Sequence, residues 1–358
     1  MKKNFFKKMA AGVLVAAMAF SLSACGGNDA SNSNENTGNS ADSSNEPITV
    51  GFSQVGAESD WRTANTESMK STFSEANGYK LIFDDAQQKQ ENQLSAIRNF
   101  IQQDVDYIVL APVTETGWDT VLQEAKDAGI PVIIVDRMVE AKDDLFTAWV
   151  GSDFELEGKK AAEYLKAYNE AKSKEKGTKI VDIQGTIGAS AQIGRTKGLE
   201  DGVKANGWNL LDKTTGEFTQ AKGQEVMESF LKKYKKDIDV VYCENDNEAF
   251  GAVDAIKAAG YTVGDDGDMM IFSFDSTRAG LKAVLSGQIT LNTECNPLHG
   301  PRVEKIIQQL ENNETPEKKA YVDEEMFAHD DTVKSITVDG KEYPVTVVTE
   351  EVINSRKY

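Results

Sequence analysis

Short apolar runs alternate with longer mixed stretches along most of the chain, starting after Pro47. The short runs are rich in Val and Ile and hold few polar residues, which is typical of strands buried on both faces of a parallel sheet. The longer stretches have the composition and apolar spacing of helices. We expect strands over 48–53, 81–83, 107–110, 132–135, 146–150, 179–183, 238–243 and 269–274. We expect helices over 58–77, 88–103, 115–128, 154–170, 190–205, 248–259, a short stretch through 285, and 297–311.

The order of these elements predicts the fold class. Strand and helix alternate up to Val135, and the alternation then restarts with the strand at 146–150. Two successive βα blocks predict an α/β protein with two doubly wound parallel-sheet lobes. In open parallel sheets ligands bind beyond the carboxyl ends of the strands, so we expect a cleft between the lobes. The tail from Val322 is richer in strand formers and carries a hairpin-like turn at 337–340.

The first residues have the pattern of a lipoprotein signal peptide. Four lysines (Lys2, Lys3, Lys7 and Lys8) precede an apolar run over 9–20, and 22–25 reads Leu-Ser-Ala-Cys, a lipobox. The run is short for a membrane-spanning helix and suits an export signal. We therefore expect cleavage before Cys25, lipidation of its thiol and anchoring at the extracytoplasmic face of the cell membrane. The alternative is a secreted protein whose signal happens to end in cysteine.

Residues 26–46 are mostly Ser, Asn, Gly, Asp and Glu. Such a stretch buries too little apolar surface to offset its ordering entropy, which predicts a flexible linker. The sequence thus divides into a signal peptide over 1–24, a lipidated cysteine with its linker over 25–47, and a folded part from Ile48.

Charge and cysteine content exclude some functions. The formal net charge is −19, and removal of the signal peptide would take away lysines only. An acidic protein is a poor partner for nucleic acid or anionic lipid. Beyond Cys25 there are only Cys243 and Cys295, too few for a disulfide framework. We expect two free thiols, with a single bridge as the alternative.

Polar and aromatic residues follow the predicted strands of the first block. Trp61 offers an indole face that suits the C–H face of a sugar ring, although it could equally pack in a helix face. Asp136 and Arg137 follow the strand at 132–135, where a carboxylate and a guanidinium can bind vicinal hydroxyls in a complementary way. The alternative for that pair is a local ion pair that fixes the loop.

The second block repeats this arrangement. A glycine-rich turn over 185–190 leads to Arg195, while Asn245 and Asp275 follow two further strands. A lone Asn or Asp in such a place is more often a helix cap. The turn lacks Walker spacing, and the first strand is followed by Gly56 alone rather than three spaced glycines, so phosphate and nicotinamide binding are not supported.

Several motifs together resemble a known family. They are Gly51-Phe52-Ser53-Gln54, Trp61-Arg62, the run over 87–93, Ala111-Pro112-Val113, Gly117-Trp118, Asp136-Arg137, Gln184-Gly185-Thr186 and Gly188-Ala189-Ser190. The set resembles the sugar-binding proteins of ABC importers, of the ribose- and galactose-binding type, and within them the galactofuranose-binding branch. The resemblance covers roughly 48–315, and the tail beyond Val322 departs from it.

The resemblance implies a type I periplasmic-binding-protein-like fold with three crossovers, near Gly151, Glu294 and Tyr321. The N-terminal lobe would comprise 48–151 plus 295–321, and the C-terminal lobe 152–294 plus 322–358. The ligand-binding residues that the resemblance implies, with Ser53 and Gln54 as auxiliary contacts, are Ser53, Gln54, Trp61, Arg62, Asp136, Arg137, Arg195, Asn245, Asp275 and Glu294. Asp84 or Asp85 would lie near the cleft mouth, and Trp118 would pack inside its lobe.

We therefore predict a monomeric lipoprotein that captures a monosaccharide, galactofuranose-like or another pentose or hexose, and delivers it to the permease of an ABC importer, with no cofactor and no metal. One alternative is a sugar sensor that docks on a membrane kinase or chemoreceptor. An enzyme is disfavoured, because His299 and His329 follow no predicted strand and no nucleophile motif appears, although Asp136 and Asp275 could in principle flank a glycosidic bond. A repressor's effector domain shares this architecture, but the signal peptide and the missing helix-turn-helix argue against it.

Overall fold

The computed structural model describes residues 46–173 and 177–358. The predicted signal peptide, Cys25 and nearly all of the predicted linker lie outside these ranges. Within the described part of the chain, no helix is both long enough and apolar enough to cross a membrane.

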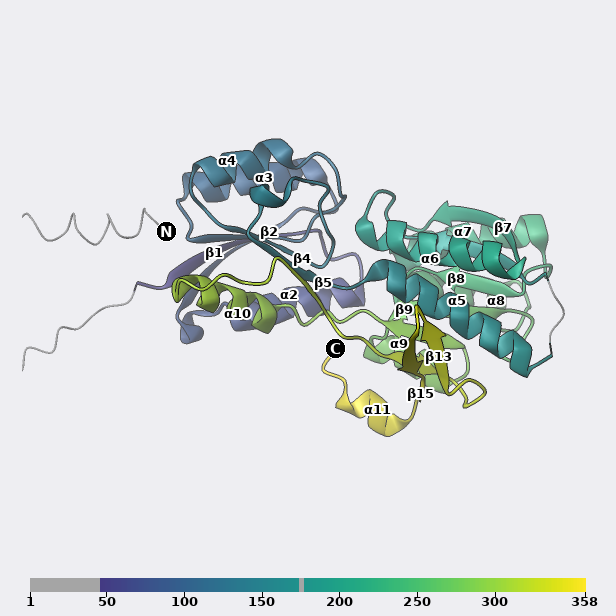
Figure 1. The fold of residues 1–358 in the computed structure, drawn as a ribbon. Helices are drawn as coiled ribbons and strands as arrows, with labels where there is room; N and C mark the ends of the chain where they lie inside the picture. The colour runs from purple at the N-terminus through teal and green to yellow at the C-terminus, as the bar shows by residue number, and fades with distance from the viewer. Residues whose placement is uncertain (1–45, 174–176) are drawn as a thin grey trace, which may run out of the picture. The chain divides into compact units, whose positions relative to one another are not determined.

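The first sheet has six strands in the order β11-β5-β4-β3-β1-β2, and all its neighbouring pairs are parallel (Figure 1). Its strands are β1 (Ile48–Gln54), β2 (Tyr79–Asp85), β3 (Tyr107–Leu110), β4 (Val132–Val135), β5 (Ala148–Gly151) and β11 (Lys319–Tyr321). Its helices are α2 (Asp60–Thr72), α3 (Gln90–Gln102), α4 (Asp119–Asp127) and α10 (Gly300–Glu311), with short 3₁₀ turns η1 (Glu75–Asn77) and η2 (Asp143–Leu145).

Both faces of this sheet are covered. Alternate residues along a strand point to opposite faces, so Val109 packs with the α2 and α10 side while Ile108 packs with the α3 and α4 side. Burial on both faces explains why β3 and β4 appear in the sequence as uninterrupted apolar runs.

The second sheet has seven strands in the order β15-β12-β10-β9-β8-β6-β7. Five are parallel, and β12 runs antiparallel to β10 at one edge and parallel to β15, so the predicted parallel sheet gains an antiparallel edge built from the tail. The strands are β6 (Lys179–Gln184), β7 (Asn209–Thr215), β8 (Val240–Cys243), β9 (Met270–Asp275), β10 (Leu291–Glu294), β12 (Met326–Ala328) and β15 (Thr346–Val347). The helices are α5 (Phe154–Ala171), α6 (Ser190–Asn206), α7 (Gln220–Tyr234), α8 (Asp246–Ala258), α9 (Arg278–Leu285) and α11 (Glu350–Ser355).

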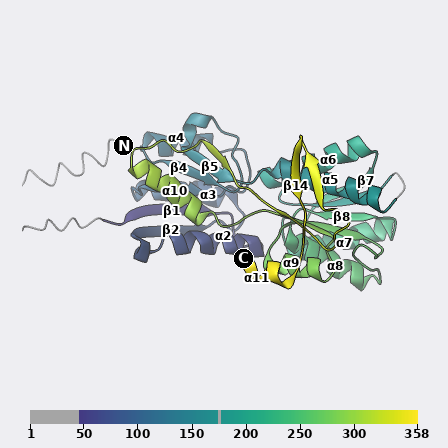
Figure 2. The ribbon, with the colours of Figure 1, turned by 60° about the horizontal axis from the view of Figure 1, so that its bottom comes forward.

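The tail completes the second lobe. A hairpin of β13 (Ser335–Val338) and β14 (Lys341–Pro344) turns at the predicted place, with Asp339 and Gly340 both at positive φ. The hairpin contacts α5 and adds Ile336 and Val338 to the core on that side of the sheet (Figure 2). The helix α11 covers the opposite side next to α9 and contributes Ile353 to the core there.

The chain passes between the two sheets three times. It leaves the first sheet after Gly151, returns after Glu294, and leaves again after Tyr321. A Cβ on Gly151 would lie 2.3 Å from the Asp136 carbonyl oxygen, so the first passage needs glycine at this close approach. The three passages meet, because the Ser152 hydroxyl lies 3.3 Å from the Cys295 sulfur and donates to Glu324 Oε1 at 2.6 Å.

Helices α5 and α6 approach closely through glycines. A Cβ on Gly198 would lie 2.5 Å from the carbonyl carbon of Gly158, and one on Gly158 would lie 2.7 Å from the Arg195 carbonyl oxygen. This contact fixes the place of Arg195 on α6.

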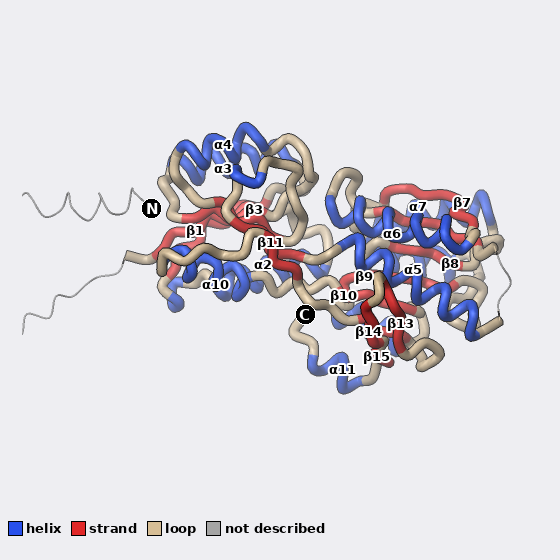
Figure 3. Tube along the Cα trace, in the orientation of Figure 1, coloured by secondary structure: helices blue, strands red, loops and turns tan. Residues whose placement is uncertain are grey.

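Most predicted elements are confirmed (Figure 3). The strands at Tyr107–Leu110 and Val132–Val135 match their predicted bounds. The predicted helix over 58–77 is shorter, because Ser59 caps α2 and the chain turns again at η1. Neither β7 nor the helix α7 after it was predicted; β7 is an edge strand with a half-buried, largely polar sequence.

Candidate functional site

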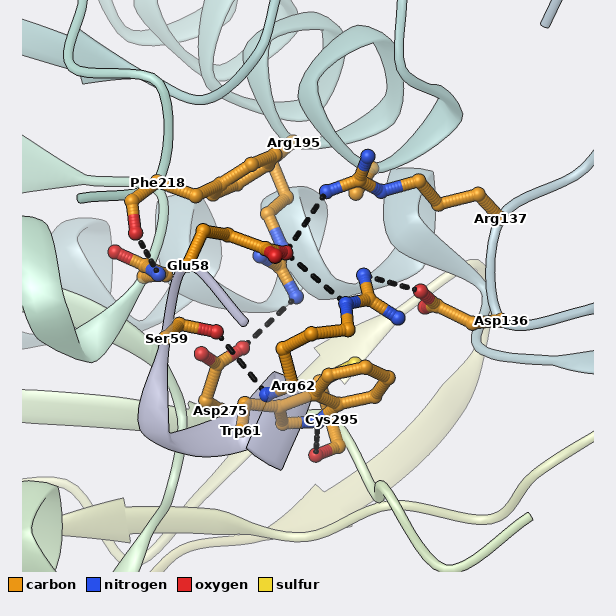
Figure 4. Close-up of a pocket in the computed structure, with 12 residues that line it drawn as sticks. Glu58, Ser59, Trp61, Arg62, Asp136, Arg137, Arg195, Phe218, Asp275 and Cys295 are labelled. Atoms are coloured by element: carbon orange, nitrogen blue, oxygen red, sulfur yellow. Dashed lines mark hydrogen bonds and ion pairs between the residues drawn. The ribbon is translucent and has the colours of Figure 1, made fainter. Parts of the chain in front are cut away.

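The ends of strands from both lobes meet at one small pocket (Figure 4). The lining residues are Glu58, Ser59, Trp61, Arg62, Asp136, Arg137, Ala191, Arg195, Phe218, Asn245, Asp275 and Cys295.

Seven of the ten residues predicted to bind the ligand line this pocket. They are Trp61, Arg62, Asp136, Arg137, Arg195, Asn245 and Asp275, and each is at most 4 % exposed. The structure thus brings together residues that lie more than 200 positions apart in the sequence. Their contact with a ligand stays a prediction.

The other three lie elsewhere. Ser53 is buried in β1, and no hydrogen bond is found for its hydroxyl. Gln54 lies behind the pocket, where its amide donates to Asn65 Oδ1 at 2.8 Å and its oxygen accepts from Arg62 Nη1 at 3.2 Å. Glu294 is held by the tail, outside the pocket.

Two secondary expectations can also be placed. Trp118 is fully buried in the core of its lobe and donates to the Thr114 carbonyl at 2.7 Å, which confirms its packing role. Asp84 and Asp85 do not line the pocket. Cys243 and Cys295 are both free and buried, as expected, so the single-bridge alternative is wrong.

The local backbone structure explains why the polar side chains of the first lobe point towards the pocket. Ser59 caps α2 and accepts from the Arg62 amide at 3.1 Å, which places Trp61 and Arg62 in the first turn, facing the pocket. Asp136 follows β4 with φ 62°, and this left-handed conformation turns its carboxylate towards Arg62.

In the second lobe, a helix cap and a left-handed backbone again orient the polar side chains. Asn245 caps α8 by accepting from the Glu248 amide at 2.8 Å, and its own amide donates to the Phe218 carbonyl at 3.0 Å. Asp275 ends β9 with φ 96°, another conformation that side chains rarely adopt. Such strain at a strand end in a pocket is a signature of a functional position.

The charges in the pocket are paired (Figure 4). Arg62 lies 2.8 Å from Asp136 Oδ2 and 3.0 Å from Glu58 Oε1, and its guanidinium stacks 4.6 Å from the Trp61 ring centre. Burial alone would lower the pKa of Arg62, but Asp136 and Glu58 outweigh it and the pKa is raised. Arg62 is therefore a permanent cation with its donors fixed in one plane.

Arg195 is the corresponding cation of the second lobe. Its Nε lies 2.7 Å from Glu157 Oε2 and its Nη2 3.5 Å from Asp275 Oδ1. Burial opposes the charge, but Glu157 and other neighbours raise the pKa of Arg195. Burial raises the pKa of Asp275 in spite of the nearby Arg195.

Arg137 is the least neutralised of the three arginines. It donates to the Val113 carbonyl at 3.0 Å, while its nearest carboxylate oxygen, on Glu58, is 3.9 Å away. Burial and the nearby Arg62 lower the pKa of Arg137 to about 10, so it remains charged at neutral pH. Its guanidinium lies 5.0 Å from the centre of the Phe218 ring in the other lobe.

Apolar groups complete the pocket. Trp61 packs in one buried cluster with Phe154, Ala189, Phe218 and Cys295, which come from both lobes. The Trp61 indole nitrogen donates to the Cys295 carbonyl at 2.6 Å, so the ring is held in one orientation. Paired charges beside a fixed aromatic face form a surface suited to a molecule with hydroxyls on its rim and C–H groups on its face.

Five lining residues were not predicted: Glu58, Ser59, Ala191, Phe218 and Cys295. Glu58 and Ser59 directly precede α2, the helix that carries Trp61, and this position was a usable signal. Phe218 and Cys295 follow β7 and β10, two strands absent from the predicted set, so their places at strand ends went unrecognised.

One group in the described part of the chain has the geometry of a metal site. Ligand atoms of Glu157, Cys295 and Glu324 lie within 4.8 Å of one another. Arg195 already occupies one oxygen of Glu157, while Ser152 and the Asn296 amide occupy Glu324 Oε1. These donors already supply hydrogen bonds to the carboxylates of Glu157 and Glu324, and the neighbouring Lys160 adds positive charge.

The two lobes touch across the pocket. The Glu115 amide donates to the Gly188 carbonyl at 2.9 Å, the Met138 amide to Ser190 Oγ at 2.8 Å, and the Asp60 amide to Asn247 Oδ1 at 3.1 Å. Each bond joins one lobe to the other, so the structure represents the closed arrangement.

Comparison with known proteins agrees with this architecture. Residues 50–294, more than half of the chain, match the family model described as a periplasmic binding protein domain. The chain is 42% identical to the galactofuranose-binding protein YtfQ of Escherichia coli over 278 residues, which cover 76% of this chain and 85% of that protein.

Two solved structures are similar as well. A protein from Mycobacterium smegmatis in complex with β-D-fucofuranose is 42% identical, with a TM-score of 0.75 over 80% of this chain and 92% of that one. The binding protein of the arabinose ABC transporter from Shewanella sp. ANA-3, bound to L-arabinofuranose, is 42% identical, with a TM-score of 0.73 over 79% of this chain and 93% of that one.

Proposed function

Because the chain belongs to the family of periplasmic binding proteins, we propose that it captures one neutral monosaccharide in the pocket between its lobes and delivers it to an ABC importer. The proposed sugar is a furanose of the galactofuranose type, or a related pentose or hexose. The observation that carries the proposal is the set of buried, paired charges that both lobes contribute around Trp61.

The charge balance favours a neutral ligand. Three arginines line the pocket, and three acids, Glu58, Asp136 and Asp275, line it with them. At Arg62 and Arg195 an anionic sugar would have to displace an acid from its arginine and leave it buried without a partner, which is costly. Hydroxyl groups can accept from a guanidinium and donate to a carboxylate without disturbing the pairs.

Capture would follow from closure. Neither lobe alone surrounds the pocket, so a sugar that bonds to Asp136 on one side and Asp275 on the other stabilises the closed state. Micromolar binding would correspond to about −8 kcal/mol. The closed surfaces of both lobes would then be presented together to the permease.

Anchoring is a further part of the proposal. A signal peptide cleaved before Cys25, with a lipid on that thiol, would keep the protein at the outer face of the cell membrane, and the linker up to Pro47 would let it reach the permease. Replacing Cys25 with Ser should abolish attachment of a fatty acid, which metabolic labelling of the expressing cells measures. Equal labelling of the wild type and Cys25→Ser would contradict lipid anchoring.

The test of sugar binding is calorimetry of the purified protein against a panel of monosaccharides that includes furanose forms. Arg137→Ala removes a charged donor and should weaken binding by about 1.5–3 kcal/mol, or about 10–150-fold. Arg98→Ala, which removes an exposed arginine of the same lobe, is the matched control and should bind as the wild type does. Failure of every sugar to bind the wild type would reject the proposal, and unchanged affinity in Arg137→Ala would remove Arg137 from the site.

Glycosides of the same sugars test the enzymatic alternative. The quoted relatives are binding proteins, and we expect no product when a glycoside is incubated with the protein. Release of a free sugar at a rate abolished in Asp136→Asn and Asp275→Asn would overturn this expectation.

A further inference from the structure

Glu294 is a buried carboxylate at the second passage between the lobes, and it does not line the pocket. Its Oε1 accepts hydrogen bonds from Arg356 Nη2 at 2.7 Å and from the Tyr358 hydroxyl at 2.6 Å. Its Oε2 accepts from the Glu325 amide at 2.9 Å. Both oxygens are therefore occupied by groups that lie far along the chain.

The segment Arg356–Tyr358, here called the strap, is itself firmly held. The Arg356 guanidinium lies 5.2 Å from the centre of the Phe327 ring and 4.6 Å from that of Tyr358, and it also reaches Glu325 at 3.7 Å. The Tyr358 carbonyl accepts from the Arg278 amide at 2.9 Å, which ties the strap to the start of α9. Burial would raise the pKa of Glu294, but Arg356 and Tyr358 outweigh it and lower that pKa, so the contact is a charged one.

The strap reaches the pocket through one residue. Cys295 follows Glu294, lines the pocket, and takes the Trp61 indole hydrogen bond on its carbonyl at 2.6 Å. The next residue, Asn296, donates its amide to Glu324 Oε1 at 2.7 Å, and Glu324 lies on the third passage. A carboxylate fixed at Glu294 thus fixes both the Cys295 carbonyl and the third passage beside it.

We propose that Arg356 and Tyr358 are positioning residues of the binding site, which hold Glu294 so that Cys295 keeps Trp61 in place and the closed lobes stay aligned. The effect on sugar affinity rests on the proposed function. The effect on the alignment of the lobes does not, and the two can be measured separately.

The first measurement is sugar affinity by calorimetry, with L-arabinose and D-galactose as probes. Arg356→Ala should weaken binding by about 10-fold or more, and Tyr358→Phe, which removes one hydroxyl, by about 3–10-fold. Lys357→Ala, which alters an exposed residue between them, is the matched control and should leave affinity unchanged. Wild-type affinity in both strap variants would contradict a role in positioning the pocket.

The second measurement needs no sugar. In a chain that carries Cys25→Ser and Cys243→Ser, Cys295 is the one thiol, and its reaction with a disulfide reagent such as DTNB reports opening of the pocket. Arg356→Ala and Tyr358→Phe should each raise its rate several-fold, while Lys357→Ala should not.

A chain with Cys25→Ser and Cys295→Ser separates positioning from general loss of stability. Its remaining thiol, Cys243, is buried in the core of the second lobe and reacts only when that core opens. Faster reaction at Cys295 alone supports the proposal, and equal acceleration at both thiols overturns it. If no probe sugar binds even the wild type but Cys295 alone reacts faster in the strap variants, the positioning role stands and the proposed sugar function fails.

Discussion

Two aspartates have a strained backbone conformation that directs their carboxylates into the pocket. Asp136 and Asp275 end β4 and β9 with φ values of 62° and 96°, and both place a carboxylate beside an arginine. A left-handed backbone costs a residue with a side chain on the order of 1 kcal/mol or more, and least for Asp and Asn. The same choice in both lobes indicates that the position of the carboxylate outweighs this cost.

A graded pair of substitutions tests this interpretation. Asp136→Asn keeps a side chain that tolerates the backbone, whereas Asp136→Ala removes the partner of Arg62 and adds strain. We expect Asp136→Ala to lower the free energy of unfolding by about 3–5 kcal/mol and Asp136→Asn by clearly less. Urea denaturation measures both, and wild-type stability in both variants would show that neither the pair nor the backbone matters at this position.

A buried acid beneath the pocket predicts a pH dependence of stability. Burial raises the pKa of Glu244 from its ordinary value of 4.5 to about 8, although Thr196 and the Gly185 amide donate to it. A raised acid pKa stabilises the fold fully below the unfolded-state value, and that contribution is lost as pH rises through the folded-state value. The wild type should therefore lose stability between about pH 4.5 and 8.

The substitution Glu244→Gln isolates this group. Relative to Glu244→Gln, the wild type should lose about 1–4 kcal/mol of unfolding free energy between pH 5 and pH 8. Glu200→Gln, on the exposed side of α6, is the control and should run parallel to the wild type. Parallel curves for Glu244→Gln as well would mean that Glu244 is ionised throughout this range.

At the scale of elements, α5 and α6 pack closely through glycines. The glycines at 158 and 198 bring the two backbones together, and Arg195 lies one turn before Gly198 on the same helix. This contact between α5 and α6, here called the seam, thus controls both the stability of the lobe and the position of a pocket arginine.

Gly198→Ala should force the helices apart, because its Cβ would lie 2.5 Å from the backbone of Gly158. We expect a loss of about 1–3 kcal/mol in the free energy of unfolding and weaker sugar binding. Lys204→Ala, an exposed site of the same helix, should change neither quantity. A variant as stable as the wild type would show that the seam can relax freely.

The elements also show what the sequence could predict. Strands buried on both faces, such as β3 and β4, have uninterrupted apolar runs and were placed at their observed bounds. The edge strand β7, the four-residue strand β10 and the three-residue strands β11 and β12 were not, because strands that are largely polar or very short have no clear apolar pattern.

The pocket residues divide in the same way, according to whether the strand before them could be predicted. The seven pocket residues found in advance follow strands that the apolar pattern predicts or begin the helices after them, whereas Phe218 and Cys295 follow strands that it does not. The place of Glu294 depends on its contacts with Arg356 and Tyr358, and no local pattern in a sequence predicts a contact over more than sixty residues.

At the scale of the whole folded part, the hydrogen bonds across the pocket define a closed state that the sugar should favour. The radius of gyration measured by small-angle X-ray scattering should fall when a saturating sugar is added to the wild type. In Arg137→Ala it should stay at the sugar-free value at the same sugar concentration, while Arg98→Ala should respond as the wild type does. An equal fall of the radius of gyration in Arg137→Ala would show that the lobes close around the sugar without Arg137.

The meeting of the three passages at Ser152, Cys295 and Glu324 restricts how the lobes can move. Because three chain segments are connected at nearly the same place, the lobes cannot easily slide or twist relative to each other. Rotation about a common hinge axis is then the motion of lowest energy cost. A permease of the kind proposed above would then meet an open and a closed arrangement of the lobes. The fraction of molecules in the closed arrangement would set how often that permease meets a loaded binding protein.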